Sequence, residues 1–441
     1  MRTVSFVGHV DLEVHGGVSP SALLLADVDN DGENELTVGT ETGDLYVFKG
    51  LQTQPLCHVS ELGMITAICC GPLTAPGQNV LAVISGNGWV HVLEMDGSSL
   101  RQRHSQRIPA NVKTALLADV DLDQQLELVV ALTDRVVRVY RWTDGTLRAI
   151  SKCELMQQIG TISLNIEGDG RPSVLVSQPG AAVVRLRYRS SLDEDGHECH
   201  SVDIDDVSLA VKTRQNVSCE VLGGLRDQPA SNTYALITMD GSLFYVKDNA
   251  VEWSVVLHHQ LFGLTKMDVT SDGSDELIVS SWDGHTFIIN QEKQSVQFLF
   301  EEAVTAFAAG QFGARTGSNV PCMVYATVGK VVVYHNVRLP VMVTETLTDV
   351  VAHEHGWPGA ERLTACQLQQ LYRWCLYGFP RPQLEAAECD TPQPPQDDAH
   401  PEQSDGAAGG ARGGDAQIEE EGWHRAECDA PGRRTNASDA A

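Results

Sequence analysis

A strand-and-loop pattern repeats along the chain and restricts the possible folds more than any other feature. Each copy has an apolar strand, an acidic or turn-rich loop, a second strand, and a glycine-containing turn into a third strand. Seven copies follow one another at intervals of roughly 42 to 57 residues. The recognisable parts of the copies begin at different points of the repeat and lie in residues 23–48, 65–93, 119–140, 162–188, 236–246, 268–289 and 304–334. Four-stranded propeller blades have this period, so we predict an all-β, seven-bladed β-propeller over residues 1–345.

The ring of blades must close, because each blade buries its faces against its neighbours. The segment from Thr3 to Val14 alternates polar and apolar residues and precedes the first copy. We therefore predict that it forms the outer strand of the seventh blade. Between the fourth and fifth copies, the segment from Arg189 to Asp206 is polar and acidic, which predicts an exposed insertion.

The pattern changes after the last copy. In residues 346–380, five apolar residues fall on one face of a helix, and Gly378 and Pro380 would end it. They are Leu368, Leu371, Tyr372, Cys375 and Leu376. We predict a short helical segment that packs on the propeller or serves a partner. Residues 381–441 are rich in Pro, Gly, Ala, Asp and Glu, so we predict a disordered acidic tail.

Composition narrows the classes of partner. The 441-residue chain has a formal net charge of −28, which argues against binding nucleic acid, whose partners usually present a basic face. No run of about 18 apolar residues occurs, and the N-terminal segment lacks the apolar region of a signal peptide. The eleven scattered cysteines suggest reduced thiols. We expect a cytoplasmic protein whose partners are other proteins.

The loop that begins at Asp27 has the strongest pattern for chemistry. Carboxylates at Asp27, Asp29, Asp31 and Glu35 surround a turn at Gly32, so that their oxygens converge as a hard cation requires. An EF-hand is excluded because its twelfth loop position, a bidentate Glu, is Val38 here and lies in a strand-like run. The loop is instead predicted to join two strands and to hold Ca²⁺ or Mg²⁺.

Two other loops have weaker versions of this set. The third copy offers Asp119, Asp121, Asp123 and Glu127, with Gln124 in place of the turn glycine. The sixth offers Asp268, Asp272 and Glu276, with Thr270 at the third position. The alternative is that these acidic side chains cap their own loop amides without any metal.

Histidine-containing motifs give no metal prediction. His353-Glu354-His355 and the run from His197 to His200 lack a second half at zinc spacing. His258-His259 precedes a predicted strand and is expected to be structural. No nucleophile elbow, phosphate-binding glycine loop or separate carboxylate pair occurs, so we predict no enzyme activity and no other cofactor.

The first loop resembles the FG-GAP repeat of integrin α-subunits, whose carboxylates occupy positions one, three, five and nine. Asp27, Asp29, Asp31 and Glu35 fill these positions, and Glu35 departs from the usual Asp. The runs Thr133 to Trp142, Ser177 to Gly180 and His258 to Asn290 narrow the match. Residues 1 to 345 thereby resemble the integrin-α FG-GAP repeat-containing proteins of the KICSTOR complex.

The resemblance implies a non-catalytic scaffold subunit. Such a subunit pairs with kaptin and assembles with a very large scaffold subunit and the other KICSTOR subunits. The complex sits on the cytosolic face of the lysosomal membrane through its partners. There it recruits the GATOR GTPase-activating complex and restrains TOR kinase signalling when amino acids or glucose are scarce.

Two alternatives come from other classes of protein. One is an extracellular, calcium-dependent adhesion module of integrin type, which glycosylation at Asn216 would favour. The other is a propeller enzyme with a central metal or cofactor, for which turnover by the purified protein is the test.

Overall fold

The computed structural model divides the chain into two compact units, Met1–Val351 and Ala352–Ala441. It describes residues 2–344 except 193–197, 208, 210, 212–213, 215, 227–231 and 316, and beyond these only residues 370, 373–374 and 377–378. All 29 strands of the described residues lie in the first unit. No helix among these residues has the length and apolar character that a membrane span needs.

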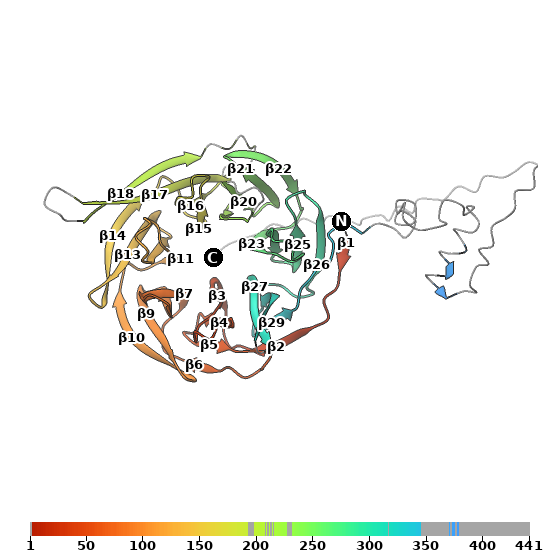
Figure 1. Cartoon of the computed structure of the whole chain (residues 1–441), viewed down its shortest axis with the longest axis horizontal. Coiled ribbons are helices and arrows are strands. Elements are labelled where there is room, and N and C mark those ends of the chain that lie inside the picture. The colour runs from red at the N-terminus through yellow and green to blue at the C-terminus, as the bar shows by residue number, and fades with distance from the viewer. Residues whose placement is uncertain are drawn as a thin grey trace, which may run out of the picture. The chain divides into compact units, whose positions relative to one another are not determined.

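The strands form seven sheets around a common centre, as predicted, and each sheet has four antiparallel strands (Figure 1). The strands of the first four blades are given from the centre outward. They are β3 (Val18–Ala26), β4 (Glu35–Thr40), β5 (Leu45–Phe48) and β6 (Cys57–Val59); β7 (Ile65–Ala75), β8 (Gln78–Ser85), β9 (Trp89–Asp96) and β10 (Ser99–Arg107); β11 (Val112–Ala118), β12 (Glu127–Leu132), β13 (Val136–Thr143) and β14 (Thr146–Glu154); and β15 (Ile162–Ile166), β16 (Pro172–Gln178), β17 (Ala182–Leu192) and β18 (Glu198–Val207).

The last three blades continue the ring, and the N-terminal strands join two of them. The strands are β19 (Cys219–Leu222), β20 (Thr233–Thr238), β21 (Ser242–Lys247) and β22 (Ala250–Val256); β23 (Leu261–Met267), β24 (Glu276–Ser281), β25 (His285–Ile289), β26 (Ser295–Leu299) and β1 (Arg2–Val4); and β27 (Ala306–Arg315), β28 (Ser318–Ala326), β29 (Lys330–His335) and β2 (His9–Glu13).

Apolar residues are buried in seven clusters, and each cluster lies between two successive blades. Between the second and third blades, for example, Val90 and Val92 pack with Leu128 and Val130. The second strand of a blade is buried on both sides, and every residue of β4, β12, β20 and β24 is buried. This two-sided burial explains the near-continuous apolar runs that made the repeat visible in the sequence.

The N-terminal segment closes the ring, with one difference from the prediction. Strand β2 pairs antiparallel with β29, so that Leu12 faces Val331, and Leu12 and Val14 are buried in the cluster between the seventh and first blades. The predicted strand from Thr3 to Val14 is interrupted, however. Its beginning forms β1, which pairs in parallel with β26 as a fifth strand of the sixth blade.

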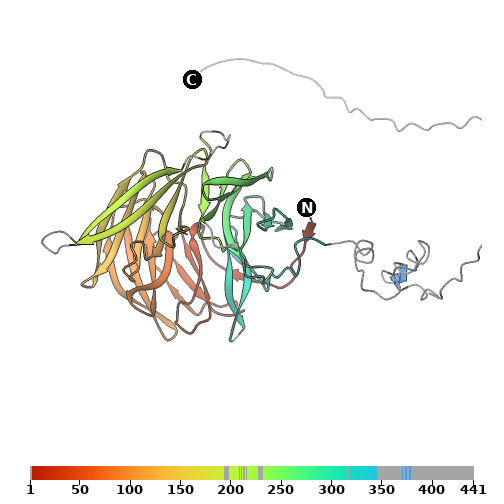
Figure 2. The same cartoon turned by 45° about the horizontal axis from the view of Figure 1, so that its top comes forward.

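The polar segment between the fourth and fifth copies is exposed, as predicted, and it forms the outer part of the β17–β18 hairpin. This hairpin is drawn in yellow-green at the rim of the ring (Figure 2). Oppositely charged side chains on the two strands pair, with Arg187 lying 3.5 Å from Asp205 and Arg189 lying 2.6 Å from Asp203. These cross-strand pairs explain how so polar a segment can be a strand.

The five apolar residues of the predicted C-terminal helix lie outside the described residues, and so does the predicted disordered tail 381–441. Gln370, Arg373, Trp374 and Tyr377 have helical backbone and are exposed. The N–H of Gly378, at φ +65°, donates to the carbonyl of Trp374 at 2.9 Å. A left-handed glycine is a common end of a helix, which fits the predicted end at Gly378.

Candidate functional site

Loops leave the propeller on two faces, because successive strands of a blade are antiparallel. One face carries the loops between first and second strands, including residues 27–34, 119–126 and 268–275, and we call it the acidic-loop face. The other carries the turns between second and third strands and the connections between blades. We call it the hairpin face; its turns include residues 41–44, 239–241, 282–284 and 327–329.

The structure brings three of the four predicted ligands of the first blade together on the acidic-loop face. Asp27, Asp29 and Glu35 each place a carboxylate oxygen within 4.8 Å of the other two. Asp27 is turned onto its own loop, where it accepts the N–H of Asp31 at 3.1 Å and the N–H of Gly32 at 3.0 Å. The loop-capping function that Asp and Asn commonly have is therefore present here.

A lysine lies at the point on which these carboxylates converge. Lys49 Nζ is 2.5 Å from Asp29 Oδ2 and 3.2 Å from Glu35 Oε1, and it also contacts Asp31. Glu35 is fully buried, and its other oxygen accepts the N–H of Val28 at 2.9 Å. Burial lowers the pKa of Lys49, but its hydrogen bonds to the carboxylates outweigh burial and raise that pKa. The ammonium is therefore charged.

An arginine has the same place in the third blade. Arg141 Nη2 lies 2.9 Å from Asp121, 3.0 Å from Asp123 and 2.8 Å from Glu127. Glu127 is fully buried, and Arg141 faces it directly across β12 and β13. Gln124, at φ +70°, adopts the left-handed conformation that the turn requires, so the loop keeps its shape without the glycine.

The two basic residues occupy equivalent positions, each opposite the buried glutamate that starts the second strand. They supply positive charge where a bound cation would otherwise supply it. A divalent ion beside a charged lysine or arginine would be repelled at close range and would lose carboxylate ligands that are already engaged. With Lys49 charged, Asp27, Asp29, Asp31 and Glu35 therefore do not fit Ca²⁺ or Mg²⁺.

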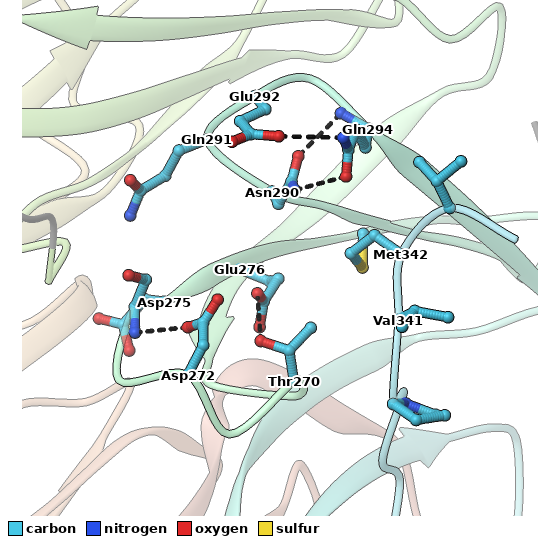
Figure 3. A pocket seen from close by; sticks show the side chains of 13 residues that line it. Thr270, Asp272, Asp275, Glu276, Asn290, Gln291, Glu292, Gln294, Val341 and Met342 are labelled. Atoms are coloured by element: carbon cyan, nitrogen blue, oxygen red, sulfur yellow. Dashed lines mark hydrogen bonds between the residues drawn. The ribbon is translucent and has the colours of Figure 1, made fainter. Parts of the chain in front are cut away.

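The sixth blade differs at this position. The residue opposite Glu276 is Asn290, whose amide donates to Gln294 at 3.0 Å within its own turn. Glu276 accepts the N–H of Val269 at 2.7 Å and the hydroxyl of Thr270 at 3.0 Å. Thr270, Asp272 and Glu276 line an open pocket of about 470 Å³, whose described lining includes no lysine or arginine (Figure 3).

The hairpin face presents apolar side chains to solvent. Seven large apolar residues on this face are 39% to 90% exposed and come from blade connections, turns and strand ends. They are Met64, Trp89, Met156, Met239, Val256, Leu299 and Val328. Exposed apolar side chains also occur on the acidic-loop face, where Leu122 and Ile166 are 59% and 46% exposed. The sequence did not indicate the residues of the hairpin face, because each stands alone, without periodicity.

Comparison with known proteins now decides the family. The model of the family described as integrin-alpha FG-GAP repeat-containing protein 2, Itfg2, matches residues 49–339. The KICSTOR complex protein ITFG2 of Mus musculus is 34% identical over 397 residues, covering 80% of this chain and 90% of the relative. The chain belongs to the ITFG2 family. The Bos taurus protein of the same name is 35% identical over 399 residues, covering 80% of this chain and 74% of the relative.

Solved structures share the fold of this ITFG2 family member. BBS1N, crystallised in complex with ARL6DN and soaked with mercury, matches with a TM-score of 0.59 at 18% identity. The match covers 78% of this chain and all of BBS1N. The lead-soaked crystal form gives a TM-score of 0.56 at 17% identity, with the same coverage. At these identities the likeness shows the propeller fold alone.

The resemblance stated from the sequence is thus confirmed at the level of the family. The ITFG2 family assignment does not depend on the acidic loop that first suggested FG-GAP repeats, since the family model begins at residue 49, beyond that loop. Lys49 and Arg141 are the site residues that the sequence pattern missed. The signal that could have found them is a basic residue at the strand position opposite the buried glutamate.

Proposed function

We propose that this chain is a non-catalytic scaffold subunit of a KICSTOR complex. The observation that carries the proposal is its 34–35% identity, over 80% of its length, to two proteins named KICSTOR complex protein ITFG2. As such a subunit it binds kaptin, the large scaffold subunit and the other KICSTOR subunits. The assembly recruits the GATOR complex to the cytosolic face of the lysosomal membrane and restrains TOR kinase signalling during amino-acid or glucose deprivation.

Exposed apolar side chains on the hairpin face support this proposal, because a partner would cover them. Met156 and Val328 on this face are 86% and 90% exposed. Their exposure favours burial by a partner. A propeller of the same fold, BBS1N, was crystallised in complex with another protein, ARL6DN.

An integrin-type, calcium-dependent adhesion module is not supported by the geometry. Such a module depends on divalent cations in its acidic loops. In the first and third blades, Lys49 and Arg141 already contact the carboxylates that those cations would need.

The test is affinity purification of the tagged full chain from fed and from amino-acid-starved cells, followed by identification of the co-purifying proteins. We expect kaptin and the other KICSTOR subunits in near-stoichiometric amounts under both conditions, because a scaffold subunit stays assembled. Recovery of the chain without any KICSTOR subunit in either condition would overturn the proposal.

A further inference from the structure

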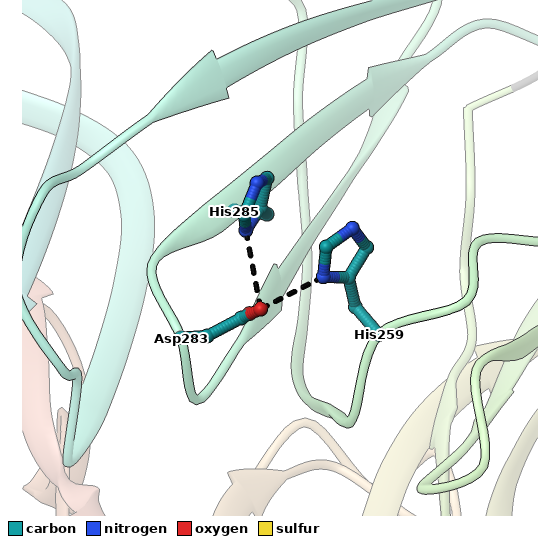
Figure 4. Close-up of side chains that lie close together, drawn as sticks. All are labelled: His259, Asp283 and His285. Atoms are coloured by element: carbon teal, nitrogen blue, oxygen red, sulfur yellow. Dashed lines mark hydrogen bonds and ion pairs between the residues drawn. The ribbon is translucent and has the colours of Figure 1, made fainter. Parts of the chain in front are cut away.

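Two histidines and an aspartate lie together on the hairpin face, at the sixth blade (Figure 4). His259 comes from the connection between β22 and β23, Asp283 from the turn between β24 and β25, and His285 from the start of β25. Asp283 Oδ2 lies 2.8 Å from His259 Nδ1 and 3.3 Å from His285 Nδ1. All three ligand atoms lie within 4.8 Å of one another.

The turn holds the aspartate in one orientation. Ser281 Oγ donates to Asp283 Oδ1 at 2.5 Å and accepts the N–H of His285 at 3.1 Å. Gly284 has φ +88°, and a Cβ there would lie 2.0 Å from the carbonyl oxygen of Phe300, so this turn needs glycine. One carboxylate oxygen is thus used within the turn, and the other is directed at the two imidazole rings.

The imidazole rings are also fixed in place. The rings of His259 and His285 stack with their centroids 4.0 Å apart, and His259 contacts Phe287 at 5.6 Å between centroids. His285 Nδ1 is shielded from solvent and makes no hydrogen bond to any described residue, although it faces Asp283. A buried ring nitrogen without a hydrogen bond is costly, and a bound metal would satisfy it.

Burial raises the pKa of Asp283, but hydrogen bonds from Ser281 and His259 outweigh burial and lower it to about 2. Two imidazoles and one carboxylate suit a borderline transition metal, whereas Ca²⁺ and Mg²⁺ prefer sets of six or more oxygens.

We propose that His259, Asp283 and His285 bind a zinc-class transition-metal dication. In a tetrahedral zinc site with bonds of about 2.0–2.1 Å, the ligand atoms lie about 3.3 Å apart, close to the 2.8 Å and 3.3 Å measured here. Water completes the coordination shell. The metal links the connection between the fifth and sixth blades to the β24–β25 turn. Ser281 is the outer-shell partner that orients Asp283.

The ion has a route to this site. An open pocket of about 620 Å³ lies beside the cluster and is lined by His258, His259 and Asp240. The side chains of His259 and Asp283 are 25% and 55% exposed. The interpretation of His259 as a structural histidine is compatible with metal binding, because the ion would stabilise the fold by linking the β22–β23 connection to the β24–β25 turn. The proposal does not depend on membership of a KICSTOR complex.

The test is calorimetric titration of the purified, chelator-stripped full chain with ZnCl₂ under reducing conditions, using CaCl₂ and MgCl₂ as comparison ions. We expect one zinc per chain and a rise in Tm with zinc, since the ion binds the folded state. His259→Gln, His285→Gln and Asp283→Asn should each weaken binding by at least about tenfold.

The matched control is His58→Gln. His58 also pairs with a turn aspartate of the hairpin face, Asp44 at 3.1 Å, but no second histidine of the described residues joins this pair. This variant should bind zinc as the wild type does. Equal zinc affinity of the wild type and the His259→Gln/His285→Gln double variant would overturn the proposal, as would no zinc binding by the wild type.

Discussion

Single residues determine the chemistry of the acidic loops. Glu35 and Glu127 are fully buried carboxylates, and each accepts one backbone N–H and contacts one basic side chain. A buried carboxylate without a positive partner is costly, so the basic residue stabilises the loop as a bound cation would. In the sixth blade, the hydroxyl of Thr270 donates to the equivalent glutamate, Glu276, in place of a basic side chain.

Replacing Lys49 with methionine should destabilise the propeller by about 1–3 kcal/mol, because buried Glu35 loses its charged partner. Urea denaturation measures this loss. Calcium in excess should raise the Tm of Lys49→Met, whose carboxylates are then available, more than it raises the Tm of the wild type.

The control for this substitution is Lys330→Met. Lys330 pairs with Glu302 at 2.5 Å, but both side chains are more than a third exposed, so the loss should stay below about 1 kcal/mol. Calcium binding by the wild type as tight as that by Lys49→Met would contradict this account of the acidic loops.

At the scale of strands, closure of the ring depends on β2. Leu12 and Val14 are 3% and 1% exposed, and burial of each contributes about 1.5–3 kcal/mol. Deleting residues 1–14 should therefore cost at least about 3 kcal/mol and leave the edge of β29 unpaired.

Deleting only residues 1–5 is the matched comparison for this closure. It removes β1, whose residues are exposed or half-buried and which is an added fifth strand on the sixth blade. Thermal unfolding should show a clearly smaller loss for this variant. Equal losses for the two deletions would mean that β2 does not close the ring.

Strand predictions succeeded where burial repeats in the sequence. Strands β4, β12 and β24 follow acidic loops and are buried on both sides, so their apolar runs stand out. The prediction was incomplete for the N-terminal strand, which divides between two blades, because pairing partners are set by tertiary contacts. The outer part of the β17–β18 hairpin, from Arg189 to Asp206, was predicted only as a polar insertion, since its cross-strand ion pairs depend on register.

The candidate site could be predicted in part, because part of it follows a pattern that is local in the sequence. The acidic loops follow a local sequence pattern, so Asp27, Asp29 and Glu35 could be placed together from the sequence. Lys49 could not, because the whole β4–β5 hairpin separates it from Glu35 in sequence. His259 and Asp283 likewise meet only because the β22–β23 connection and the β24–β25 turn lie on the same face of the ring.

Considered as a whole, the propeller presents two faces on one ring of blades. On the acidic-loop face two carboxylate loops contact Lys49 and Arg141, and the hairpin face has its own set of exposed apolar side chains. Seven clusters of buried apolar residues between successive blades hold the ring together. We propose that the hairpin face takes part in binding the partners.

The most direct measurement is affinity purification of the wild type and of two charge variants, comparing how much of the KICSTOR subunits each recovers. The hairpin-face variant combines Met156→Glu, Met239→Glu and Val328→Glu. The control combines Leu122→Glu and Ile166→Glu at the acidic-loop face, where these side chains are 59% and 46% exposed. Exposed substitutions should leave the Tm of both variants near that of the wild type.

We expect the hairpin-face variant to lose at least about tenfold in recovery of the KICSTOR subunits, since charges would be buried against apolar contacts. The control variant should recover them as the wild type does. Normal recovery by the hairpin-face variant, with loss by the acidic-loop control, would contradict the account.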